Sequence, residues 1–129
     1  MTAEPRPNAA SDGELHRLID EHPPDLQRIE LRLRDLVFEL YPDALEYVDM
    51  GNKLLGYASG TKMSNLLFAL IVHKSWVNLQ LADGALLNDP DGIVEGTGKR
   101  IRHVKCRSVE DAERPAVRRL MEQQLQRRR

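Results

Sequence analysis

The sequence predicts an α+β domain in which an antiparallel sheet of about five strands packs against N-terminal and C-terminal helices. Two consecutive segments within residues 66–81 have strand patterns, and residues 25–41 carry apolar residues at helical spacing. The predicted order is helix, four strands, loop, strand and helix, which is typical of α+β folds. A length of 129 residues corresponds to a single domain.

The N-terminal residues 1–10 are polar and contain two prolines, so we expect a disordered tail. Ser11 then has the side chain and position of a helix cap, before a short apolar-faced helix that His22-Pro23-Pro24 ends. The folded domain is expected over residues 11–126, and residues 127–129 are expected to be a frayed basic tail.

The first long helix is predicted over residues 25–41 and has two apolar strips. Leu31 and Phe38, seven residues apart, lie on nearly the opposite side from the main strip. A helix that is apolar on two sides usually has two neighbours, which favours cover by another helix; the alternative is the seam of a homodimer. The main strip comprises Leu26, Ile29, Leu33, Leu36, Val37 and Leu40.

The remaining elements follow from alternation and turn residues. Gly51-Asn52 is a good hairpin turn between two short strands, and Pro115 fits the first turn of a final amphipathic helix. The predicted strands cover residues 46–50, 53–58, 66–72, 75–81 and 101–106.

The central hairpin, residues 66–81, sets the two faces of the sheet. Residues 66–72 are apolar throughout, as in a strand covered on both faces, whereas residues 75–81 alternate. A two-residue turn at His73-Lys74 would pair Leu70 with Val77, which gives one wholly apolar face for the core. His-Lys is a poor turn pair, so a longer loop is an alternative, and a one-residue change of register would swap the faces of the second strand.

The other face of this hairpin is half polar and is the candidate binding surface. It carries Trp76, Asn78 and Gln80 beside small and aliphatic residues. Such a mixture suits a ligand pocket or a subunit interface, and it also suits a face covered by a helix with its amides bonded to backbone. The expected surface comprises Tyr57, Trp76, Asn78 and Gln80, flanked by Lys53 and by Gly98-Lys99-Arg100.

The glycine-rich loop at residues 96–100 resembles a phosphate-binding loop but lacks the residues that define that motif. Ile93 occupies the position of the first glycine, Arg100 stands where serine or threonine is needed, and a strand follows instead of a helix. Two alternatives remain: an anion site to which Arg102 and His103 contribute, or a flexible turn before a charged edge strand.

The charge is unevenly distributed although the net charge is −1. Residues 1–98 hold 8 basic and 16 acidic residues, and residues 99–129 hold 11 basic and 4 acidic residues. The basic part could bind the acidic body of its own chain, a second subunit or an external anion. Nucleic acid is not expected, because aromatic residues do not interleave with the basic ones.

The sequence offers no signature for catalysis. The four histidines lie in different segments, so no Ser/His/Asp set, metal-ligand spacing or cofactor motif can be assigned, and we expect a non-enzymatic protein without a cofactor. The single cysteine, Cys106, fits a reducing cytoplasm and the role of a small buried hydrophobe. Neither a signal peptide nor a membrane span is expected.

Several segments together resemble the YdhG-like domains, a bacterial family of largely unknown function, over roughly residues 25–126. The resemblance implies a compact α+β fold. Some relatives are described as frataxin-like iron chaperones, so the alternative function is iron delivery through acidic residues of the first long helix and first strand. The turn Met50-Gly51-Asn52-Lys53 departs from the family's Tyr-Gly-Met-Pro-like turn, which weakens that transfer. The matching segments are residues 41–44, 49–57, 73–81 and 95–104.

Overall fold

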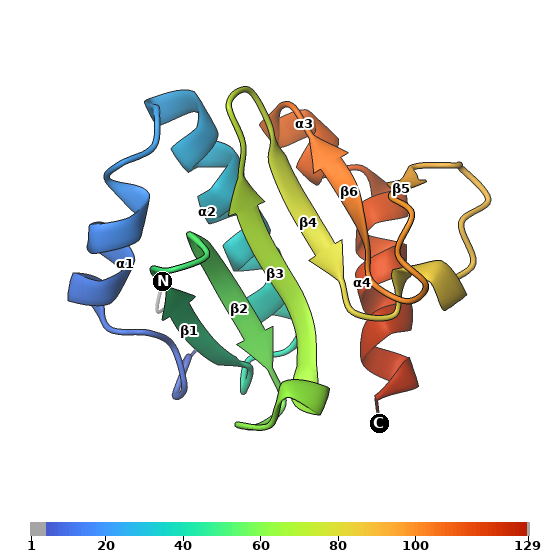
Figure 1. The fold of residues 1–129 in the computed structure, drawn as a ribbon, viewed down its shortest axis with the longest axis horizontal. Helices are drawn as coiled ribbons and strands as arrows, with labels where there is room; N and C mark the ends of the chain where they lie inside the picture. Colours follow the sequence, from blue (N-terminus) through green and yellow to red (C-terminus); the bar gives the residue numbers. More distant parts are fainter. Residues whose placement is uncertain (1–4, 129) are drawn as a thin grey trace.

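The computed structural model describes residues 5–128 and confirms the predicted α+β fold. Its antiparallel sheet has six strands, one more than expected, in the order β1-β2-β3-β4-β6-β5 (Figure 1). The additional strand β5 is only two residues long, too short to give a periodic signal. The elements are α1 (Asp12–Ile19), α2 (Pro24–Leu40), β1 (Leu45–Asp49), β2 (Leu54–Ala58), β3 (Leu66–Val72), β4 (Val77–Leu81), β5 (Val94–Glu95), β6 (Arg102–Cys106), α3 (Val109–Ala112) and α4 (Pro115–Arg127).

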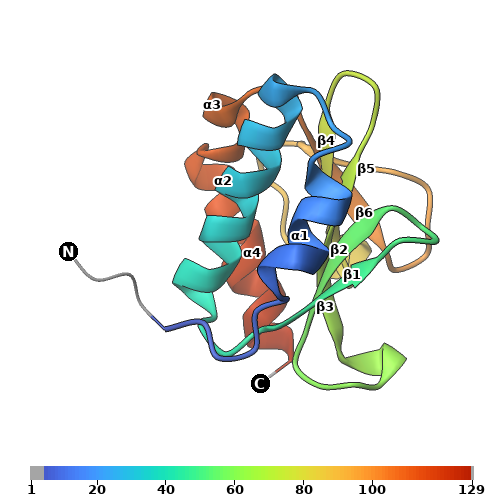
Figure 2. The ribbon, with the colours of Figure 1, turned by 90° about the vertical axis from the view of Figure 1, so that its left-hand side faces the viewer.

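The molecule has two layers, with the helices on one side of the sheet (Figure 2). The core fills the space between them: Leu33 and Val37 of α2 meet strand residues such as Leu70 and Leu79, all fully buried. No helix of residues 5–128 covers the other face of the sheet. None of the helices in this range is both long and apolar enough to cross a membrane.

The central hairpin has the predicted faces with a different register. Residues 73–76 form a four-residue connection, so Leu70 pairs with Leu79 and Val72 with Val77, two residues from the predicted pairing. Because a shift of two residues preserves the alternation, the apolar side chains still share the core face. The longer loop agrees with the poor turn propensity of His73-Lys74.

The chain ends are more ordered than the sequence indicated, within the range that the structure describes. Arg6 bonds Asp35 at 3.1 Å, and the Asn8 carbonyl accepts the Glu46 amide at 3.0 Å, so residues 6–10 are held against the body instead of forming a disordered tail. At the other end, α4 continues to Arg127, and Arg128 is bonded to Asp83, so these two residues are not frayed. Residues 1–4 and 129 of the two predicted tails lie outside the described residues.

The second apolar strip of α2 is only partly exposed. Phe38 is 2% exposed and meets the Tyr57 ring edge-on at 5.8 Å, with Arg6 and Arg34 packed over it. Its cover therefore comes from β2 and from arginine side chains instead of a second helix. Leu31 is 40% exposed. The homodimer stays a prediction, and Phe38 is not available to its seam.

Candidate functional site

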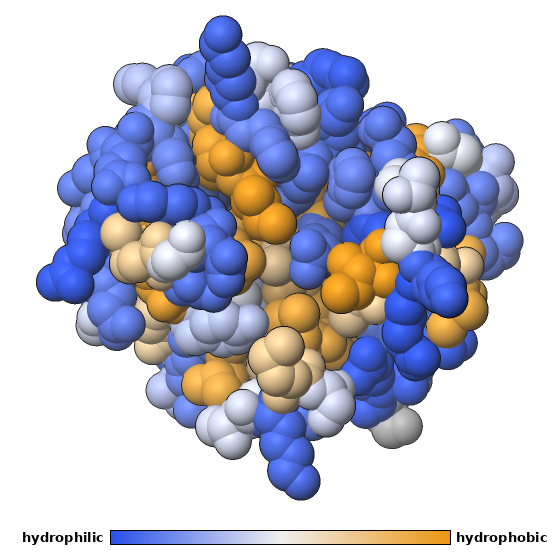
Figure 3. Space-filling view, viewed as in Figure 1, coloured by the Kyte–Doolittle hydropathy of each residue, from blue (hydrophilic) through white to orange (hydrophobic). Residues whose placement is uncertain are grey.

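The face of the sheet away from the helices, here called the open face, is built from two rows of cross-strand neighbours. Side chains that are paired across an antiparallel sheet lie on the same face, so the register assigns each row. Figure 3 looks onto this face and shows a band of hydrophobic residues across its middle, surrounded by hydrophilic ones. One row is Asp49, Leu54, Ile71, Asn78 and Lys105, and the other is Tyr47, Gly56, Ala69, Gln80, His103 and Glu95.

The half of the open face formed by β1, β2 and the start of β3 is mainly apolar, and Asp49 is the charged residue of its rows. Tyr47 lies across Gly56, where any Cβ would clash with the ring, so the glycine permits the close approach. The ring is 38% exposed, and partial burial together with Asp49 raises the pKa of its phenol. A groove of about 530 Å³ runs beside it, between these strands and residues 60–63. Leu45, Leu54, Leu66 and Met63 line this groove.

The half formed by β4 and β6 is polar and is ordered around Trp76. His73 stacks on the indole at 5.0 Å, and the Lys105 ammonium lies 4.4 Å from the ring centroid. The indole N–H donates to Asn78 Oδ1 at 2.9 Å, and the Asn78 amide nitrogen lies 3.0 Å from His73 Nε2. Trp76 is thus held in place by its neighbours and is not sealed under a helix, which was one of the two interpretations of this face.

The polar half carries positive charge at the end of β6. Lys105 lies between Trp76 and Glu95, with its ammonium 3.9 Å from the Glu95 carboxylate. Burial lowers the pKa of His103, an effect that Glu95 opposes and that Lys105 and His73 reinforce. Lys105 is therefore the fixed cation of the two rows.

Four of the residues expected at a binding surface do share the open face: Trp76, Asn78, Gln80 and His103. Tyr57 does not, which corrects the prediction. It pairs with Phe68 on the core face, is fully buried, and donates to Glu46 Oε2 at 2.7 Å.

Lys53 is drawn toward the helical layer, because its ammonium pairs with the Glu21 carboxylate at 3.0 Å. Its position beside Trp76 was therefore predicted wrongly. The turn that carries it has a positive φ of 54° at this residue, a conformation that sequence pattern alone did not indicate.

The predicted basic loop does not flank Trp76 either. It leads into β6 at Arg102, which pairs with Leu81, whereas Trp76 precedes Val77 at the opposite end of β4. Arg102 shares the core side with Leu81 and donates to the Gly98 carbonyl at 2.6 Å. Within the same loop, Lys99 is exposed, and Arg100 donates to Asp83 at 2.6 Å.

Sequence reasoning missed Tyr47, Leu54 and Lys105 as members of the open face. The alternation of residues 45–49 could have indicated Tyr47, since it places this residue opposite to Glu46 and Val48. Lys105 required the pairing of β4 with β6, which joins segments separated by a long loop. That pairing has no local signal.

The iron alternative requires several ligand side chains that lie close together. Within residues 5–128, no group of three or more histidine, cysteine or acidic side chains is placed to hold a metal ion. Several of the acids proposed for iron are engaged elsewhere. Asp35 pairs with Arg6, Glu39 with Arg32 and Arg118, and Glu46 with Arg34.

No protein-family model matches this chain, and comparisons with curated proteins and with solved structures give no match either. The resemblance to the YdhG-like domains therefore stays a prediction, and the assignment of a site depends on the geometry of the open face.

Cys106 has the structural role that the sequence indicated. It is fully buried in β6, and burial raises the pKa of its thiol to about 12. A thiol with such a pKa is protonated at neutral pH and is a poor nucleophile.

Glu30 of α2 is a buried acid that should make the stability of the protein depend on pH. It is 1% exposed, with Oε1 3.0 Å from His22 Nδ1 and Oε2 without a partner among residues 5–128. Burial raises the pKa of Glu30 above 4.5, and His22 opposes this. Because the folded pKa is raised, the contribution to stability is complete below the unfolded pKa and is lost as the pH rises through the folded pKa.

We therefore expect Glu30→Gln to raise the free energy of unfolding by about 1 kcal/mol at pH 7 and to change it little at pH 4. Glutamine keeps the bond to His22 and removes the buried charge. Urea unfolding at the two pH values measures this difference. An equal effect at both would show that the charge of Glu30 does not matter.

Proposed function

We propose that this chain is a non-enzymatic protein-binding module whose open face binds a partner segment carrying apolar side chains flanked by acidic ones. The observation that supports this proposal is the change along the two rows, from Tyr47, Leu54 and Ile71 on β1–β3 to Lys105 on β6, on a face without helical cover in residues 5–128. Large apolar surface rimmed by polar residues is characteristic of interaction sites. The single buried cysteine supports a cytoplasmic setting.

A protein partner fits this surface better than a small anion does. Two of the basic side chains expected to bind an anion are paired within the chain, Lys53 with Glu21 and Arg100 with Asp83. The groove beside Tyr47 is bounded mainly by apolar side chains, which suits the anchors of a protein segment.

Charge complementarity sets the second requirement on the partner. Lys105 stands at the polar end of the rows, and His73 and His103 lie near it. An acidic side chain of the partner would take the place of Glu95, which reaches Lys105 only at 3.9 Å. The partner's apolar residues would then lie over Leu54 and Ile71.

The test is selection of binders from a random peptide library against the purified protein, followed by amide chemical-shift mapping of an enriched peptide. We expect enriched sequences to combine apolar with acidic residues and to shift amides of β1–β4 and β6. Leu54→Asp and Ile71→Asp should each weaken binding at least tenfold, because each places an unpaired charge in the contact. Lys105→Glu should also weaken it.

Leu31→Asp is the matched control, because Leu31 is an exposed leucine of α2 and lies in the helical layer. It should bind the peptide as the unchanged protein does. Failure to enrich any peptide, enrichment without acidic residues, or shifts confined to the helices would each overturn the proposal.

A further inference from the structure

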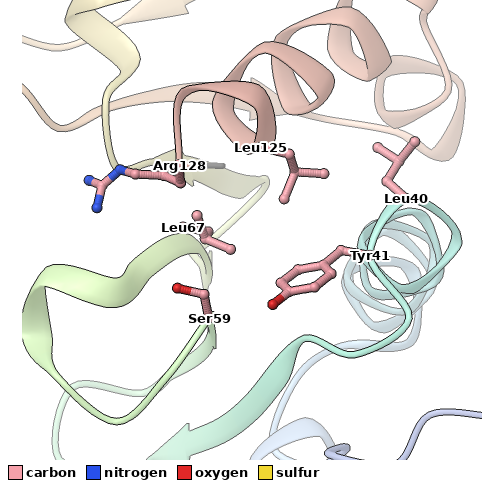
Figure 4. Close-up of a pocket in the computed structure, with 6 residues that line it drawn as sticks. All are labelled: Leu40, Tyr41, Ser59, Leu67, Leu125 and Arg128. Carbon is pink, nitrogen blue, oxygen red and sulfur yellow. The ribbon is translucent and has the colours of Figure 1, made fainter.

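A separate cavity lies on the helical side of the sheet, where the last turns of α2 and α4 meet the end of β2 and the start of β3. Its volume is about 160 Å³. Figure 4 shows the six residues that line it, which come from four different parts of the chain. They are Leu40, Tyr41, Ser59, Leu67, Leu125 and Arg128.

The walls of the cavity are fixed by backbone features. Tyr57 pairs with Phe68 but Ala58 pairs with Leu66, so Leu67 is the extra residue of a β-bulge, and it is 1% exposed. Bulges of this kind redirect one side chain without breaking the sheet. Tyr41 follows α2 directly, and its amide donates to the Val37 carbonyl at 2.8 Å, which fixes the backbone that carries the ring.

Three polar side chains line the cavity: Tyr41, Ser59 and Arg128. In Figure 4 the Tyr41 hydroxyl points toward Ser59, whose own hydroxyl is directed away from the tyrosine and donates to the Asn65 carbonyl at 3.5 Å. The Arg128 side chain also extends away from the tyrosine. Arg128 bonds Asp83 through Nε at 2.8 Å and also the Ser64 carbonyl, so its guanidinium is engaged outside the cavity. Among the residues that the structure describes, the Tyr41 hydroxyl bonds no other side chain or backbone group.

We propose that this cavity binds an uncharged molecule of single-ring size that carries one hydroxyl group. An apolar protein cavity of about 150 Å³ is large enough for benzene, so 160 Å³ accommodates one ring. The three leucines contact the ring, and the hydroxyl of the ligand bonds the Tyr41 hydroxyl. Two helices end here with their partial negative charge, which favours a hydrogen-bond donor over an anion.

The experiment is an amide chemical-shift titration of the full chain with phenol, toluene and benzoate as probes. Phenol should shift amides of residues around 40–41, 59, 67 and 125 and should bind about threefold to tenfold more tightly than toluene, the effect of one added hydrogen bond. Benzoate should bind most weakly. Leu125→Phe, which fills the cavity, should abolish binding of both phenol and toluene.

Tyr41→Phe keeps the ring and removes the hydroxyl, so it should weaken phenol binding and bring its affinity close to that of toluene. Ser75→Ala, which removes a hydroxyl from the exposed connection between β3 and β4, is the control and should leave the preference for phenol intact. The proposal fails if phenol shifts no amides at the cavity, if Tyr41→Phe preserves the preference, or if benzoate binds most tightly. Because Tyr41→Phe retains the packing of the ring, this test does not depend on Leu125→Phe folding.

Discussion

Replacement of Asp83 by alanine is expected to lower the free energy of unfolding by about 3 kcal/mol. The carboxylate is 1% exposed and accepts four hydrogen bonds: from Arg100 at 2.6 Å, from Gln124 at 2.8 Å, and from Arg128 at 2.8 and 3.1 Å. Its amide also donates to the Gln124 side chain at 2.7 Å. Asp83 therefore joins the end of β4 to α4 and to the loop before β6.

The expected loss of stability depends on the partners of Asp83 that would remain without an acceptor. Gln124 is fully buried, so its amide nitrogen would lose its acceptor and stay away from water. Arg100 has 61% of its side chain exposed and Arg128 26%, so the arginines can turn to solvent. The cost should thus fall at the lower end of the range for breaking a buried ion pair.

The same site predicts sensitivity to acid. Hydrogen bonds from Arg128, and then from Arg100 and Gln124, hold the pKa of Asp83 well below its ordinary value of 3.8. Since the folded pKa is lowered, the stabilisation is present above the unfolded pKa and is lost as the pH falls toward the folded pKa. Asp83→Asn should therefore reduce the difference in stability between pH 5 and pH 2.5.

Urea unfolding of the unchanged protein, Asp83→Ala and Asp83→Asn at these two pH values measures both effects. Asp91→Asn is the matched control, because Asp91 is an exposed acid that pairs with Arg119 at 3.3 Å. An exposed pair contributes about 0.5 kcal/mol or less. If Asp83→Ala were no more destabilising than this control, the hydrogen bonds of Asp83 would not contribute to the stability of the fold.

Asp83 also shows how the uneven charge of the chain is resolved. The sequence left three recipients open for its basic C-terminal part. In the structure, Arg100, Arg127 and Arg128 approach Asp83, and Arg118 and Arg119 pair with Glu39 and Asp91. Many of the basic C-terminal residues therefore form ion pairs with the acidic body of the same chain. The partners of Asp83 at the end of α4 lie 41 and 45 residues further along the sequence, so no local pattern indicates them.

The sequence predicted those features of the site that depend on alternation within one hairpin. Asn78 and Gln80 point to the face opposite to that of Val77 and Leu79, and a register shift of two residues does not change this. Their side of the sheet was therefore predicted correctly. Tyr57 was misplaced because its face depends on how β2 pairs with β3. The bulge at Leu67 and the long connections carry no periodic signal that would fix such a pairing.

The second large loss of stability is expected on replacement of Glu46, one of the acidic residues considered for iron binding in the sequence. Its carboxylate is fully buried, and it accepts two bonds from Arg34, at 2.7 and 3.0 Å, and one from the Tyr57 hydroxyl at 2.7 Å. Oε1 also accepts the Ala10 amide at 3.0 Å. This one side chain connects α2, β2 and the N-terminal segment to β1.

We expect Glu46→Ala to lower the free energy of unfolding by about 3–5 kcal/mol, because Arg34 and Tyr57 would remain buried without their acceptor. Tyr57→Phe should cost only about 1 kcal/mol, since it removes one neutral donor and leaves the charge pair intact. Hydrogen exchange of the Ala10 amide should also accelerate in Glu46→Ala, because its bond to the Glu46 carboxylate is lost.

A double variant separates the loss of an interaction from the burial of an unpaired charge. Glu46→Leu combined with Arg34→Met replaces both ions by apolar side chains of similar length, and such replacements of buried pairs are often neutral or stabilising. We therefore expect the double variant to unfold at a higher urea concentration than Glu46→Ala or Glu46→Leu alone. If it is less stable than both, the stability of this region depends on the carboxylate bonds themselves, with the Ala10 amide and the Tyr57 hydroxyl as the groups that still require an acceptor.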